Sequence, residues 1–188
     1  EEELEVSRQI QMSMLPSEPP RIAGWEFAAY FEAARQVGGD FYDLFSLPGE
    51  PGRLGVVIAD VSDKGVPAAL FMALSRTTIR NIALRGRAPA EVLSWANRYI
   101  QEDSQSDMFL SAFYAELNTN TGQLIYANAG HNPPFLWRHD ESRFYRLPPS
   151  SPILGVLPDL DVTVSIVDLA VGDALILYTD GVTEALNA

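Results

Sequence analysis

The order of helical and β-type segments limits the folds open to this chain more than any other feature of its sequence. Two consecutive segments, residues 66–85 and 89–103, have apolar residues at helical spacing and a proline near the start, which predicts two helices in succession. Segments of β character precede them, and β segments joined by turns follow from residue 111 to residue 182. This order favours an α+β fold with antiparallel sheets over the alternating strands and helices of a parallel sheet.

The predicted strands are short apolar or alternating segments bounded by glycine, proline and asparagine. They cover residues 25–34, 40–45, 54–61, 111–117, 123–129, 135–138, 143–147, 161–169 and 174–180. Turn residues at 49–53, 118–122 and 170–173, and a further turn between the strands at 135–138 and 143–147, predict that the strands on either side of each turn form hairpins.

A separate helical pattern opens the chain. Val6, Ile10 and Met14 recur every four residues, which predicts a helix over residues 1–14. The pattern starts without a capping residue, so we expect the helix to continue upstream in a longer protein. We therefore divide the chain into an N-terminal linker helix, residues 1–16, and one domain, residues 17–188.

Composition narrows the classes of function. The 25 acidic and 13 Lys and Arg residues give a formal net charge of −12, which disfavours nucleic acid and anionic membranes as partners and suits cations. No run of 18 apolar residues predicts a transmembrane helix. The sequence has no cysteine, which excludes thiolate chemistry and is consistent with the cytoplasmic location that we expect. Catalysis would depend on carboxylates, hydroxyls, basic side chains or bound metal.

Three aspartates lie where a carboxylate is costly to desolvate. Asp40 follows two glycines that let the backbone approach closely, Asp60 lies near the end of an apolar run, and Asp180 ends another run and precedes a glycine. Hard oxygen ligands on rigid strands suit Mg²⁺ or Mn²⁺. Each aspartate alone could equally be a helix cap or an ion-pair partner, and spacing alone leaves both interpretations open.

Four motifs occur in one order along the chain. They are VGGDFYD at 37–43, ADVSDKGVPAA at 59–69, ANAGHNPP at 127–134 and YTDGVTEA at 178–185, with shorter matches at 10–16 and 152–155. Together they resemble the SpoIIE/RsbU-like branch of the PPM-type metal-dependent protein phosphatases over nearly the whole chain.

The resemblance implies an αββα sandwich, in which two antiparallel sheets are flanked by helices. It implies that Asp40 and Asp60 hold two Mn²⁺ or Mg²⁺ ions, with Asp60 bridging them. The backbone carbonyl of Val61 would complete one ion and Asp180 would bind the second. It implies no organic cofactor. A metal-activated water would attack the phosphate without a covalent phosphoenzyme.

The activity that the resemblance implies is hydrolysis of phosphoserine or phosphothreonine on a regulatory protein of the anti-sigma-factor antagonist type, in a bacterial stress-response pathway. The N-terminal helix would connect the domain to an upstream sensor domain or activator, and a homodimer is left open. The main alternative is a catalytically incomplete module of the same fold that binds a partner or dimerises. A small-molecule phosphatase is a weaker alternative, because no loop rich in ligand contacts is evident.

The sequence departs from the family pattern in two places. Members usually have glycine where this chain has Asp63, which predicts a positive φ at that position. The family's last metal-binding aspartate lies in an Asp-Asp-x-Thr stretch well beyond the Thr-Asp-Gly motif, and the sequence at hand does not contain that stretch. We therefore expect the C-terminal part of the domain, and one metal ligand with it, to be missing from this chain.

Other polar residues near the motifs have structural interpretations that compete with catalytic ones. Asp43 should point to the opposite face of its strand from Asp40 and have a structural partner. His131 is expected to fix its Gly-His-Asn-Pro-Pro loop rather than act as a catalytic acid. Arg35 and Lys64 are candidates for contact with a substrate phosphate, against an ordinary surface role.

Overall fold

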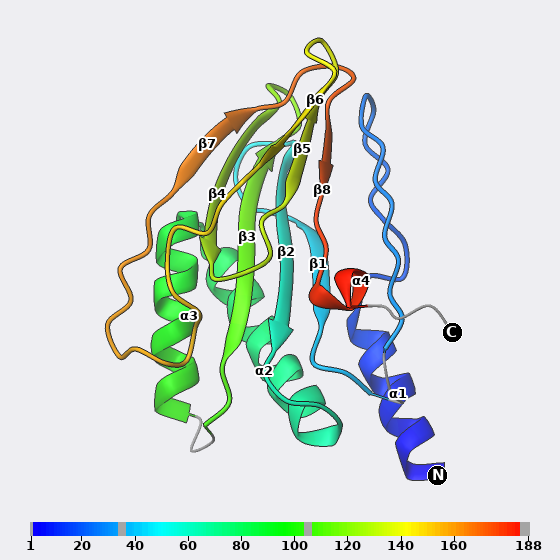
Figure 1. Cartoon of the computed structure of the whole chain (residues 1–188), viewed down its shortest axis with the longest axis vertical. Coiled ribbons are helices and arrows are strands. Elements are labelled where there is room, and N and C mark those ends of the chain that lie inside the picture. The colour runs from blue at the N-terminus through cyan, green and yellow to red at the C-terminus, as the bar shows by residue number, and fades with distance from the viewer. Residues whose placement is uncertain (1, 34–36, 104–106, 185–188) are drawn as a thin grey trace.

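The computed structural model describes residues 2–33, 37–103 and 107–184 (Figure 1). Its helices are α1 (Glu2–Met14), α2 (Val66–Ala83), α3 (Pro89–Asp103) and the short α4 (Asp180–Thr183). Its strands are β1 (Phe41–Ser46), β2 (Arg53–Val61), β3 (Leu110–Asn118), β4 (Gln123–Ala129), β5 (Phe135–Arg138), β6 (Arg143–Arg146), β7 (Ser165–Asp168) and β8 (Ala174–Ile176).

Within these residues the strands form a five-stranded sheet, in the order β1-β2-β3-β4-β7, and a three-stranded sheet, in the order β6-β5-β8. Each strand pair is antiparallel. The antiparallel α+β prediction is therefore confirmed, and so are the hairpins β1–β2, β3–β4 and β5–β6.

Two apolar cores separate three layers. Helices α2 and α3 cover one face of the five-stranded sheet, where Met72 and Leu93 pack with β2 residues such as Val57 (Figure 1). The other core lies between the sheets and includes Phe113 of β3 and Leu136 of β5. The expected arrangement of two antiparallel sheets flanked by helices is confirmed, and strand alternation sends successive residues of β2 to different cores.

A buried ion cluster joins β1 to α2. Asp43 is only 1% exposed, and its carboxylate lies 2.9 Å from the guanidinium groups of both Arg76 and Arg80. Because Asp43 is three residues after Asp40, its side chain reaches the helix-covered face of the sheet. The structural interpretation of Asp43 is confirmed.

The predicted strand at 25–34 is wrong over the described residues 25–33, which pair with no strand in the described part of the chain. Trp25 and Phe27 instead pack as side chains against the core between the sheets. The Trp25 indole N–H donates to the Thr119 carbonyl at 2.9 Å. Their apolar alternation reflects this one-sided packing rather than a hydrogen-bonded ladder.

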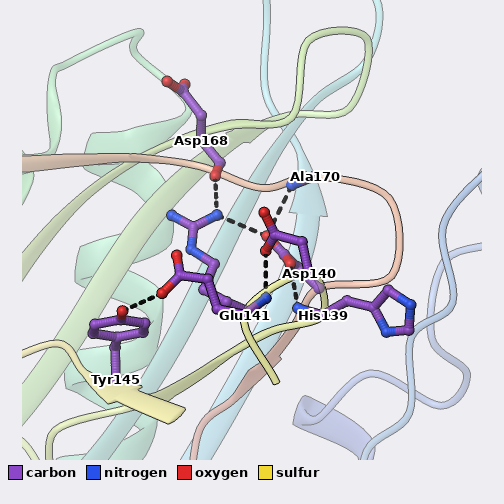
Figure 2. A network of polar contacts seen from close by, with 8 residues as sticks. His139, Asp140, Glu141, Tyr145, Asp168 and Ala170 are labelled. Atoms are coloured by element: carbon purple, nitrogen blue, oxygen red, sulfur yellow. Dashed lines mark hydrogen bonds and ion pairs between the residues drawn. The ribbon is translucent and has the colours of Figure 1, made fainter. Parts of the chain in front are cut away.

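The hairpin predicted around 170–173 is also wrong. Strand β7 pairs with β4 and β8 pairs with β5, so this turn crosses from one sheet to the other. Asp173 fixes the crossing: its carboxylate accepts hydrogen bonds from Arg138 and from the backbone N–H groups of His139 and Ala170, at 2.7–3.0 Å. Figure 2 labels His139 and Ala170 within this network. A turn signal marks the reversal but does not identify the partner of each strand.

None of the helices that the described residues form combines enough length and hydrophobicity to cross a membrane.

Candidate metal centre

Asp40 and Asp60 face each other at the open end of the β1–β2 hairpin. The register pairs Phe41 with Ala59, so Asp40, the residue before β1, falls opposite Asp60. The Asp40 carboxyl group is close enough to Asp60 to raise the pKa of Asp60 through hydrogen bonding and charge. A hydrogen bond between two carboxyl groups requires a proton on one of them, which a cation could replace.

The surroundings of Asp60 disfavour its charged form. The pKa of Asp60 is raised to about 8, first by burial and then by the hydrogen bond and charge of Asp40 and the charge of Asp180. Lys64 acts in the opposite direction but does not offset these effects. The charges of Asp40 and Asp180 therefore both act on Asp60, in a region of excess negative charge that is suited to a cation.

Asp180 reaches this region from the other sheet. Strand β8 ends at Ile176, earlier than predicted, and Asp180 is the exposed first residue of α4. The preceding residue, Thr179, donates a 2.6 Å hydrogen bond from Oγ1 to Oδ2 of Asp40. Sequence reasoning missed Thr179, although its place beside Asp180 in the YTDG motif is a signal that could have identified it.

The carbonyl of Val61 lies close to the backbone that leads into Asp40. A Cβ placed on Gly39 would fall 2.9 Å from both the carbonyl oxygen and the Cβ of Val61, which is closer than real Cβ contacts allow. Glycine is therefore required at this position. The close approach places the Val61 carbonyl oxygen against the residue that precedes Asp40. The role of this carbonyl as a metal ligand, which the family resemblance implies, stays a prediction.

The loop after Val61 is held in a defined shape. Asp63 has φ of 84°, which confirms the positive φ predicted where the family has glycine. Ser62 and Phe109 exchange two hydrogen bonds, of 2.8 and 2.9 Å. Lys64 is exposed, and Arg35 lies outside the described residues.

His131 is a buried residue of the loop beside the carboxylates. Its Nδ1 lies 2.7 Å from Oγ of Ser111, which pairs with Asp60 across β2 and β3. Its backbone N–H donates to the side chain of Asn128 at 2.8 Å, which supports the loop-fixing interpretation. Burial lowers the pKa of His131 to about 4, against weaker opposing effects from the Tyr178 backbone and the Asp40 charge. His131 is therefore neutral at pH 7.

The donor set fits a hard divalent cation in its chemistry, since it combines carboxylates with a backbone carbonyl. Over residues 2–33, 37–103 and 107–184, no group of three His, Asp or Glu side chains is gathered tightly enough to hold a metal ion. Asp40 lies opposite Asp60 in the β1–β2 register, whereas the effect of Asp180 on Asp60 is through its charge. Cation binding would therefore require Asp180 to move closer or another ligand to contribute.

Comparison with known proteins identifies the family. The profile of Stage II sporulation protein E (SpoIIE) matches residues 50–188. Phosphoserine phosphatase RsbU of Bacillus subtilis (strain 168) is 32% identical over 182 residues, which cover 97% of this chain and 53% of RsbU. Protein IcfG of Synechocystis sp. is 37% identical over 210 residues, covering 97% of this chain and 33% of IcfG. Phosphoserine phosphatase RsbP of the same Bacillus subtilis strain is 30% identical over 186 residues, covering 97% of this chain and 45% of RsbP. The chain thus spans about half of RsbU and of RsbP and a third of IcfG.

Solved structures agree on the fold. The SiaA-PP2C domain of Pseudomonas aeruginosa superposes with a TM-score of 0.78 at 23% identity, over 96% of this chain and 71% of that one. RsbX, solved in complex with magnesium, gives a TM-score of 0.64 at 17% identity, over 79% of this chain and 69% of RsbX. With its two antiparallel sheets, its carboxylate pair and a profile match over most of its length, this chain belongs to the SpoIIE family, of PP2C-type fold.

Proposed function

We propose that this domain is a phosphoprotein phosphatase that uses divalent cations to hydrolyse phosphoserine or phosphothreonine. The observation that carries the proposal is the position of Asp40 opposite Asp60 in the β1–β2 register, with the charge of Asp180 close enough to raise the pKa of Asp60. The names of two relatives support it, because RsbU and RsbP are both described as phosphoserine phosphatases. The magnesium complex of RsbX supports a metal requirement.

Asp40, Asp60 and Asp180 would hold two Mn²⁺ or Mg²⁺ ions, with Asp60 between them and the Val61 carbonyl as a further ligand. When bound, such ions lower the pKa of a coordinated water and offset the charge of the phosphoryl group. The chain itself orients the ligands. Thr179 donates to Oδ2 of Asp40 and so restricts the rotation of that carboxylate.

Electrostatics makes cations necessary for substrate binding as well as for chemistry. The chain has a formal net charge of −12, so it repels a phosphorylated partner. Bound cations would reverse the local charge at the carboxylates and attract the phosphate there. The domain would therefore bind its substrate well only in the metal-loaded state.

The partner that we propose is a phosphorylated regulatory protein of the anti-sigma-factor antagonist type, in a cytoplasmic stress-response pathway. The similarity to RsbU over 97% of this chain supports this assignment. We assign residues 1–16 to a linker that connects the phosphatase domain, residues 17–188, to an upstream sensor or activator. The exposed apolar residues Val6 and Ile10 of α1 support a paired helix, as in a homodimer.

Phosphate release from a phosphoserine peptide tests the proposal, with and without Mn²⁺ or Mg²⁺. We expect turnover that requires the cation, is abolished in Asp60→Asn and is unchanged in Asp159→Asn, an exposed aspartate outside the site. Turnover that persists in a chelator would contradict the metal-dependent mechanism. Metal-independent capture of a phosphoprotein without turnover would instead support the non-catalytic binding module.

A further inference from the structure

Among the described residues of α1, only Gln11 is buried, and it is polar. Its side chain is 4% exposed, whereas Val6 and Ile10 of the same helix are about half exposed. Buried amides are retained where they have specific partners, because an unpaired one is costly. The burial of Gln11 therefore reflects a specific polar contact rather than a hydrophobic helix face.

That contact is with one residue, Gly38. The Gln11 side-chain amide donates from Nε2 to the Gly38 carbonyl at 2.6 Å, and its Oε1 accepts from the Gly38 N–H at 3.1 Å. The amide thus satisfies both backbone groups of Gly38 at once. Among side chains, only those of Gln and Asn carry a donor and an acceptor on one planar group in this way, and Asn is one methylene shorter.

Gly38 is close enough to the carboxylates for this contact to affect them. Two peptide units separate it from Asp40, a span of at most ~7 Å. The residue between them, Gly39, is buried against Val61. A displacement of the Gly38 backbone would therefore displace Asp40 or the Val61 carbonyl as well, because the short connection and the close packing of Gly39 cannot absorb it.

The remaining contacts of α1 are few enough for Gln11 to matter. A cleft of about 510 Å³ lies between α1 and residues 31–33, lined by both segments and by Gln11 itself. Leu15, just after the helix, is buried in the helix-side core. Within the described residues 2–15, Gln11 and Leu15 are thus the side chains that are buried against the rest of the domain.

We infer that Gln11 is a positioning residue, which fixes the backbone of Gly38 and thereby holds Asp40 opposite Asp60, so that the placement of α1 sets the affinity of the site for divalent cations. The inference rests on the proposed function for its metal ions. It adds a dependence of the site on the N-terminal helix, through one amide. Partners that orient metal ligands typically change metal affinity by 10- to 100-fold when they are removed.

Calorimetric titration of Mn²⁺ into the whole chain tests the inference. Gln11→Leu removes both hydrogen bonds, and Gln11→Glu keeps an acceptor for the Gly38 N–H but loses the donor to its carbonyl. We expect both variants to bind Mn²⁺ at least tenfold more weakly than the wild type. Gln9→Leu is the matched control, because Gln9 is an exposed glutamine on the same helix, and it should stay within twofold.

Two measurements separate positioning from a general loss of structure. Urea denaturation identifies whether each variant is folded, and NMR reports the amide resonances of Asp40 and Asp60 without metal. We expect Gln11→Glu and Gln11→Leu to shift these resonances, and Gln9→Leu to leave them unchanged. Folded Gln11 variants that bind Mn²⁺ like the wild type, or that leave both resonances in place, would overturn the inference. If the wild-type chain binds no Mn²⁺, the proposed function fails, and the Asp40 and Asp60 resonances alone decide the inference.

Discussion

Gly39 and Val61 are in such close contact that a methyl group on Gly39 would lie 2.9 Å from the Val61 carbonyl oxygen. This approach sets the distance between the segment that carries Asp40 and the strand that carries Asp60. The geometry of the site is therefore sensitive to any side-chain volume that is added at Gly39.

Gly39→Ala should weaken Mn²⁺ binding at least tenfold and reduce stability by about 1–3 kcal/mol, because the added methyl group forces the two segments apart. Calorimetric titration and urea denaturation measure the two effects. The matched control is Gly38→Ala, whose Cβ would meet Ala33 at an ordinary 3.7 Å. If Gly39→Ala and Gly38→Ala had the same Mn²⁺ affinity and stability, the close approach of Gly39 to Val61 would not be what sets the geometry of the site.

The pH dependence of metal binding should follow the ionisation of Asp60. Its pKa is raised to about 8 without metal, and a cation binds the carboxylate, so binding below pH 8 releases a proton. Affinity for Mg²⁺ should rise by up to about tenfold per pH unit between pH 6 and 8 and level off above that range. Calorimetric titration in buffers of different ionisation enthalpy measures how many protons are released when the cation binds. An affinity that does not change from pH 6 to 8 would show that Asp60 is already ionised.

The same pKa shift predicts the stability of the metal-free chain. The folded-state pKa of Asp60 lies above its ordinary value of 3.8, so the folded protein holds the proton more tightly than the unfolded one. The contribution of Asp60 to stability should therefore fall as pH rises from about 4 toward 8. Chemical denaturation of the wild type and of Asp60→Asn across this range measures the effect, because the variant lacks the titrating group.

Asp43→Asn should destabilise the domain by about 3 kcal/mol, because it leaves the guanidinium groups of Arg76 and Arg80 without their buried counter-charge. This value is at the low end of the range for buried pairs, since Arg80 is 36% exposed and water can solvate it. Urea denaturation gives the free energy of unfolding. Glu91→Gln, which breaks the exposed Arg87–Glu91 pair, is the control and should cost about 0.5 kcal/mol or less. A similar small loss in Asp43→Asn would show that the cluster contributes little.

Substitution of Asp63 should separate backbone strain from side-chain contacts. With φ of 84°, Asp63→Ala should cost about 1–2 kcal/mol, since alanine is strained there and the side-chain hydrogen bond to the Lys64 N–H is lost. Asp63→Gly loses the same hydrogen bond but no strain remains, so it should be more stable than Asp63→Ala by about 1 kcal/mol. Thermal denaturation compares the two, and alanine equal to glycine would contradict the strain argument.

Much of the site could be predicted from sequence because it lies in short motifs with strict local requirements. Gly38 and Gly39 before Asp40 indicated a close backbone approach, and the apolar run before Asp60 placed that aspartate at a strand end. The opposite orientation of Asp43 followed from strand alternation alone. These are properties of neighbouring residues, which a sequence pattern records directly.

The errors concern contacts between distant segments. Local alternation at 25–33 does not reveal whether a partner strand exists, and the turn at 170–173 does not show which sheet each flanking strand joins. The two hydrogen bonds between Gln11 and Gly38 join positions 27 residues apart. No periodicity connects such positions, so only the folded chain brings them together.

The hydrogen bond from Thr179 to Asp40 closes a loop of 139 residues. Contacts of such sequence separation form only after the intervening chain is organised, because loop closure costs entropy that local contacts do not repay. A chain whose smaller sheet has not yet docked therefore contains the Asp40–Asp60 pair without Thr179 and Asp180 beside it. Completion of the carboxylate cluster thus reports that both layers of the sandwich have assembled, and a half-folded domain cannot present it.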